Sequence, residues 1–168
     1  MIIALAVISV IGIIVGVCCG VSASASTPPG EKIIVIDAGH GGIDAGVRGI
    51  VTDSKESEIN LSLCKYLRGY FTDAGFTVVM TRTTNAGLYG SSSQGFKRRD
   101  MQKRKQIIEE CSADMVISIH QNFCPIPSKR GGTVFFDKGS GCGKELANSI
   151  QKSINAMENC AEQNTALA

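Results

Sequence analysis

Apolar residues form short continuous runs along most of the chain, and longer amphipathic stretches separate these runs. Each run is rich in β-branched or aromatic residues, which predicts a buried strand. The strands are expected over 33–36, 76–80, 115–119 and 133–136. Between them, apolar residues recur at intervals of three and four, which predicts helices. The helices are expected over about 54–74, 98–111 and 143–157.

Strands that alternate with helices predict an α/β fold: a mainly parallel twisted sheet with helices on both faces, as in a phosphorylase/hydrolase-like sandwich. The length of 168 residues suits a single domain. The formal net charge of +2 is too small to indicate nucleic-acid binding, so we expect no nucleic-acid partner. We also expect a monomer. The seven cysteines contain no CxxC pair, which argues against a zinc site built from thiolates.

The first part of the chain has a different character. Residues 2–19 are uncharged and apolar, and as an apolar helix they are long enough to span a bilayer. A small-residue stretch at 23–25 fits a signal-peptidase site. We therefore expect a signal peptide or membrane anchor over 1–25, a linker over 26–31 and a folded domain over 32–168. Either alternative exports the domain, which places it in the cell wall or at the membrane surface.

The first predicted helix of that domain carries a carboxylate on its inward face. Its apolar stripe is expected at Ile59, Leu63, Tyr66, Leu67, Tyr70 and Phe71. Helical spacing puts Glu56 on the inward face and Glu58 on the solvated face. An inward carboxylate needs a partner, because burying an isolated charge is costly. The alternative is a capping box over 53–56, in which Glu56 reaches back to the backbone.

The only two histidines of the chain follow predicted strands. His40 follows the first strand, in a glycine-rich turn that also carries Asp37 and Asp44. His120 follows the third strand. Because the carboxyl ends of parallel strands meet at one edge of a sheet, we expect the two imidazoles to lie close together. Two imidazoles, the Glu56 carboxylate and an open position make a hydrolytic zinc site.

Better-known motifs do not fit the glycine-rich turn. A dinucleotide-binding GxGxxG loop would need a glycine at Asp44. A phosphate-binding P-loop would need lysine and then serine or threonine after Gly46, where the chain has Val47 and Arg48. The helical HExxH motif of one large metalloprotease class is absent from the sequence. These exclusions leave the zinc interpretation.

Three motifs occur in a characteristic order: DAGHGG over 37–42, Glu56 shortly before INL at 59–61, and SIHQN over 118–122. Together they resemble the zinc-dependent N-acetylmuramoyl-L-alanine amidases of the amidase 3 type, and the similarity extends from about residue 33 to residue 154. The resemblance implies that His40, Glu56 and His120 bind Zn²⁺. It also implies that Asp37, Arg82 and Asn122 support the ligands or contact the substrate.

The resemblance further implies a reaction and a substrate. Such an enzyme cleaves the amide bond between N-acetylmuramic acid and L-alanine in peptidoglycan, for remodelling or lysis of a bacterial cell wall. Peptidoglycan would then be the partner of the domain, and the membrane would be a partner only through an uncleaved N-terminal segment.

One departure from the family concerns the catalytic acid/base. Family members continue into another strand, with a glutamate near a Gly-Phe pair that serves this role. Nothing after Met157 resembles that strand, so we expect the domain over 32–168 to be incomplete at its C-terminal end. Asp44 is then the candidate for proton transfer, although a supporting role also suits its place in the turn. The alternative function is a catalytically impaired module that binds metal and peptidoglycan.

Overall fold

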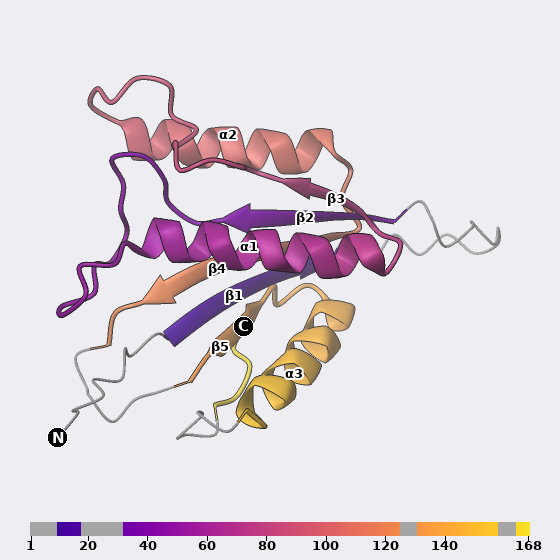
Figure 1. The fold of residues 1–168 in the computed structure, drawn as a ribbon. Coiled ribbons are helices and arrows are strands. Elements are labelled where there is room, and N and C mark those ends of the chain that lie inside the picture. The colour runs from indigo at the N-terminus through magenta and orange to yellow at the C-terminus, as the bar shows by residue number, and fades with distance from the viewer. Residues whose placement is uncertain (1–9, 18–31, 125–130, 158–163) are drawn as a thin grey trace, which may run out of the picture.

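The computed structural model describes residues 10–17, 32–124, 131–157 and 164–168. These residues form a five-stranded sheet and three helices (Figure 1). The strands are β1 (Val10–Val17), β2 (Ile33–Ala38), β3 (Thr77–Met80), β4 (Met115–Asn122) and β5 (Thr133–Phe136). The helices are α1 (Glu56–Asp73), α2 (Phe96–Glu110) and α3 (Gly141–Asn155).

The sheet has the strand order β3-β2-β4-β1-β5. Strand β2 lies between β3 and β4 and runs parallel to both. Strand β1 is antiparallel to β4 and parallel to β5, so β5 runs opposite to β4. The predicted α/β fold with a mainly parallel sheet is confirmed, but β1 and β5 run opposite to the other three strands, which the strand–helix alternation did not predict.

Residues 10–17 form strand β1, where the sequence predicts part of an apolar helix. The segment VIGIIVGV is dominated by β-branched residues, which are stiff in helices and favoured in strands. Its backbone pairs with the full length of β4, from Val10 opposite Asn122 to Val17 opposite Met115. No described helix is long and apolar enough to cross a membrane. The rest of the predicted signal or anchor, and the linker over 26–31, lie outside the described residues.

The main core lies between α1 and the three parallel strands. The buried apolar residues of this cluster are Ile34, Ile36 and Ala38 on β2, Leu61 and Cys64 on α1, and Ile117 and Ile119 on β4. Successive side chains of a strand point to opposite faces, so Asp37 faces away from α1. Asp37 pairs with Arg104 of α2, which places α2 on the other face of the sheet (Figure 1). The helix α3 packs on β5 through Ala147 and Val134.

The inward face of α1 matches the predicted stripe in part. Leu63, Leu67 and Phe71 pack against the main core, as the spacing predicts. Tyr66 and Tyr70 are 70% and 75% exposed, although the apolar spacing predicts them to be inward. The buried face instead includes Asn60 and Cys64, which are fully buried, and Leu61, which is 5% exposed. Asn60 is inside because its side-chain amide donates to the Gly39 carbonyl and to Glu56. The buried hydrogen bonds of Asn60 therefore act together with the apolar residues to set the rotation of α1.

The orientation of α1 can be tested by comparing a buried residue with an exposed residue of the helix. Replacing Leu61 by alanine should lower the free energy of unfolding by about 2–5 kcal/mol, because the deletion leaves a cavity in the core. The matched control is Tyr66→Ala, which should change the free energy by no more than about 0.5 kcal/mol, because Tyr66 is exposed. Urea denaturation measures both. A larger loss for Tyr66→Ala than for Leu61→Ala would restore the predicted stripe.

Candidate metal centre

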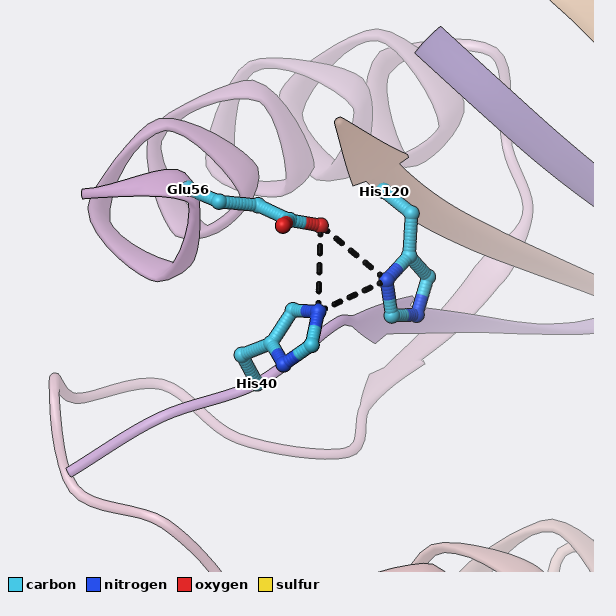
Figure 2. Close-up of side chains that lie close together, drawn as sticks. All are labelled: His40, Glu56 and His120. Carbon is cyan, nitrogen blue, oxygen red and sulfur yellow. Dashed lines mark hydrogen bonds and ion pairs between the residues drawn. The ribbon is translucent and has the colours of Figure 1, made fainter. Parts of the chain in front are cut away.

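Two parallel strands and the start of a helix bring three potential metal ligands together. His40 comes two residues after β2, and His120 lies near the end of β4. Glu56 is the first residue of α1. Figure 2 shows the two imidazoles and the carboxylate pointing toward one another. The structure thus assembles the His40, Glu56 and His120 cluster that the sequence suggested, at the carboxyl edge of the parallel strands.

The three ligand atoms form a nearly equilateral triangle. His40 Nε2 lies 3.1 Å from Glu56 Oε1. His120 Nδ1 lies 3.2 Å from the same oxygen and 3.2 Å from His40 Nε2. Ligand atoms that share one tetrahedral zinc ion at bond lengths of 2.0–2.1 Å are separated by about 3.3 Å. The donor set and its spacing therefore fit a metal ion of this kind.

Two glycines leave the space in which these ligands sit. A Cβ atom on Gly39 would come within 2.3 Å of Cε1 of the His120 ring. A Cβ atom on Gly46 would come within 2.4 Å of Glu56 Oε2, and Gly46 also has a φ of +67°, which side chains rarely allow. The glycine-rich turn is therefore shaped around the ligands themselves.

Glu56 is held by the backbone as well as by the imidazoles. Its Oε1 accepts from the Gln121 N–H at 2.8 Å, and its Oε2 accepts from the Val47 N–H at 2.8 Å. Burial raises the pKa of Glu56, but the hydrogen bonds from His120, His40 and these two N–H groups outweigh it, so the pKa lies well below its usual range. Glu56 is consequently an ionised carboxylate inside the protein.

This arrangement overturns the capping-box alternative. The N-cap of α1 is Lys55, and no side chain makes a capping hydrogen bond there. The Glu56 carboxylate faces the histidines and does not reach back to the first turn. Glu58 lies on the solvated face, where it accepts from the Lys55 ammonium at 2.8 Å. The two glutamates near the start of α1 thus have different environments.

Asp44 holds the other edge of the His40 ring. Its Oδ2 lies 2.9 Å from His40 Nδ1, whereas Glu56 contacts Nε2. The hydrogen bond to Glu56 raises the pKa of His40, burial opposes this, and Asp44 raises the pKa further, so the pKa is raised overall. The second oxygen of Asp44 lies 3.3 Å from the Lys97 ammonium. The imidazole therefore separates Asp44 from the ligand triangle.

Two buried arginines fix the backbone that carries His40. Arg82 donates from Nε to the Ala38 carbonyl at 2.8 Å and from Nη2 to the Gly39 carbonyl at 2.9 Å. Arg104 donates to the Ala38 carbonyl and to the His40 carbonyl, each at 2.7 Å. These bonds matter because His40 has a φ of 61°, a conformation that non-glycine residues seldom adopt.

The same network accounts for two residues expected to support the ligands or meet substrate. Arg82 is only 4% exposed, and its guanidinium also donates to the carbonyls of Ser57 and Thr84, so it acts on the backbone. Asp37 is buried against Arg104 and accepts from the hydroxyls of Thr81 and Ser118. Burial raises the pKa of Asp37, but Arg104 and these hydrogen bonds lower it overall.

The segment over 83–97 is rich in glycine, serine and asparagine, yet it is hydrogen-bonded to the glycine-rich turn that carries His40. The Gly42 N–H donates to the Asn85 carbonyl at 2.6 Å, and the Ile43 N–H donates to the Tyr89 hydroxyl at 2.8 Å. Arg99 of α2 binds carbonyls of the same segment, including that of Tyr89. The sequence did not single out Tyr89. It lies among serine, glycine and asparagine residues, and its partner Ile43 is 46 residues away in the chain.

A cavity of about 430 Å³ opens over the ligand triangle. His40, Glu56 and His120 line it, and so does Asn122, which is exposed at the end of β4. Its other lining residues are Asp44, Gly46, Val47, Lys97, Gln121 and Phe135. Of Asp37, Arg82 and Asn122, only Asn122 lines the cavity and can touch a ligand there.

Comparisons with known proteins identify a family over the part of the chain that contains this cluster. A family model described as N-acetylmuramoyl-L-alanine amidase matches residues 34–166, which include all three members of the triangle. The germination-specific N-acetylmuramoyl-L-alanine amidase of Bacillus subtilis is 31% identical over 132 residues, covering 77% of this chain and 55% of that protein. N-acetylmuramoyl-L-alanine amidase AmiA of Escherichia coli is 26% identical over 132 residues, covering 79% and 42%.

A comparison with solved structures also finds amidases. The CwlD amidase of Clostridioides difficile, determined in complex with the GerS lipoprotein, superposes with a TM-score of 0.73 at 30% sequence identity. The match covers 81% of this chain and 71% of that chain. The chain spans about half the length of the curated relatives it matches.

The arginine network gives a stability prediction. Arg104→Met should lower the free energy of unfolding by about 3–5 kcal/mol, because it leaves the Asp37 carboxylate buried without its counter-ion. Lys103→Met is the control on the same helix, and it should change the free energy by less than about 0.5 kcal/mol, because Lys103 is exposed. Equal urea midpoints for the two variants would mean that the Arg104–Asp37 pair does not hold the turn.

Proposed function

Because this chain belongs to the N-acetylmuramoyl-L-alanine amidase family, we propose that it hydrolyses the amide between N-acetylmuramic acid and L-alanine in peptidoglycan. The observation that carries the proposal is the triangle of His40 Nε2, Glu56 Oε1 and His120 Nδ1, which lies open to a cavity. Three protein ligands with a free fourth position are typical of hydrolytic zinc sites.

In this proposal His40, Glu56 and His120 hold a Zn²⁺ ion. When bound, zinc polarises the scissile carbonyl and acidifies a water molecule. Glu56 contributes a full negative charge to the site, because its low pKa keeps it ionised. The two imidazoles complete a set that suits zinc better than the hard cations magnesium or calcium, which prefer oxygen ligands.

Asp44 is a positioning residue in this proposal. Its hydrogen bond to His40 Nδ1 holds the ring so that Nε2 faces the triangle, which is the usual partnership of a carboxylate with a metal-binding histidine. Proton transfer by Asp44 would require it to leave both His40 and Lys97. Asn122 lines the cavity and is available to hydrogen-bond the substrate.

A second function follows from the carboxylates around the cavity. Glu56 and Asp44 are the only acidic residues among its described lining residues, and both already contact imidazoles. A hydrolase also needs a group that protonates the leaving amine. The second candidate is therefore a module that binds metal and peptidoglycan with little turnover. Both candidates act on the cell wall, so we place the domain outside the cytoplasm.

The ligand assignment is tested by a pair of neighbouring glutamates. The Glu56→Gln variant should lose stoichiometric zinc, because an amide replaces the ionised ligand, whereas Glu58→Gln should retain about one zinc per chain. Metal analysis of the purified variants measures this, with circular dichroism to establish that both are folded. Equal zinc content in the two variants would exclude Glu56 as a ligand.

The reaction is tested on purified peptidoglycan. The zinc-loaded chain should release free amino termini of L-alanine, and Glu56→Gln should reduce this release to background, because the ligand set is lost. Zinc-dependent retention on insoluble peptidoglycan without release of amino termini would favour the binding module. If the chain is not retained on peptidoglycan and releases no amino termini, both candidate functions are contradicted.

A further inference from the structure

Lys97 gives the metal cavity a positive charge on one side. It is the only lysine or arginine among the described residues that line the cavity. Its side chain is 67% exposed, and its ammonium lies 3.3 Å from Asp44 Oδ1. An ammonium group has three donors, so this contact leaves donors available for a ligand.

Lys97 also lies near the candidate metal ligands. Asp44 links it to His40 through contacts of 3.3 Å and 2.9 Å, so only one carboxylate and one imidazole separate the ammonium from the ligand triangle. A residue of an extended peptide spans about 3.3–3.6 Å. A group bound to Lys97 can therefore belong to the same small molecule that presents an amide to the triangle.

The place of Lys97 in its helix favours an anion as well. It lies in the first turn of α2, whose N-cap is Gly95 and whose first turn contains no acidic residue. A helix N-terminus carries partial positive charge and disfavours a nearby cation. Lys97 therefore does not stabilise α2 through the helix dipole. Asp44, its ion-pair partner, also contacts His40, so it does not fully neutralise the Lys97 ammonium.

We propose that Lys97 binds a carboxylate on the peptide side of the scissile amide and so selects acidic stem peptides. This inference rests on the proposed amidase or peptidoglycan-binding function. The carboxyl group of muramic acid is consumed in the scissile amide itself, so the carboxylates nearest to this bond lie on its peptide side. One residue beyond the alanine, such a carboxylate reaches about 7 Å from the alanine nitrogen. Lys97 is then a specificity residue that does not contact the reacting bond.

The test uses two ligands that differ only in charge: N-acetylmuramoyl-L-alanyl-glycine and its C-terminal amide. The zinc-loaded full chain should prefer the acid by about tenfold, as a partly solvated charge-assisted hydrogen bond provides. The preference is measured as dissociation constants by calorimetry, or as kcat/KM where the ligands are cleaved. Lys97→Met should remove the preference, and Lys97→Arg should retain it.

Arg98→Met is the matched control, because Arg98 is exposed in the same helical turn and does not line the cavity. It removes one positive charge and should leave the preference unchanged. All variants should contain the same amount of zinc, which separates loss of the anion contact from damage to His40. A preference that survives in Lys97→Met, or is absent from the wild type, would overturn the inference and leave the proposed function standing. Failure of the wild type to bind or cleave either ligand would overturn both.

Discussion

Three successive backbone carbonyls, those of Ala38, Gly39 and His40, accept hydrogen bonds from two buried guanidinium groups. Carbonyls that leave the end of a strand have no ladder partner, and buried ones must find another donor. Arg82 reaches them from the end of β3, and Arg104 reaches them from α2. The turn can therefore hold His40 in a left-handed conformation that its own sequence does not favour. The placement of His40 in the triangle therefore depends on these hydrogen bonds to the backbone.

Local pattern was sufficient to predict the strand ends and the two imidazoles. His40 and His120 follow apolar runs, and parallel pairing of β2 with β4 brings the ends of these strands together. Glu56 was predictable because helical spacing separates it from Glu58. The same spacing misplaced Tyr66, because Asn60 is buried for its hydrogen bonds and apolar periodicity does not register a buried amide.

Contacts between distant segments could not be read from the sequence. The Ile43 amide meets Tyr89, and Asp44 meets Lys97, across loops whose composition suggests no order. Each of these contacts depends on where α2 lies over the sheet, and that position is set by Arg104 and Asp37. Arg104 and Asp37 are 67 residues apart in the sequence, and only the folded sheet brings them into contact.

The position of β1 divides the sheet into two groups of strands. Strands β3, β2 and β4 form one group, and two of the candidate ligands lie at the ends of β2 and β4. Strand β5 lies with α3, and the backbone of residues 10–17 joins the two groups. The family match begins only at residue 34, after this joining strand. The same residues cannot pair with β4 and lie in a bilayer at once. Without residues 10–17 in the sheet, the β4 edge beside His120 would be an unpaired row of N–H and C=O groups, which is the kind of edge that accepts another strand.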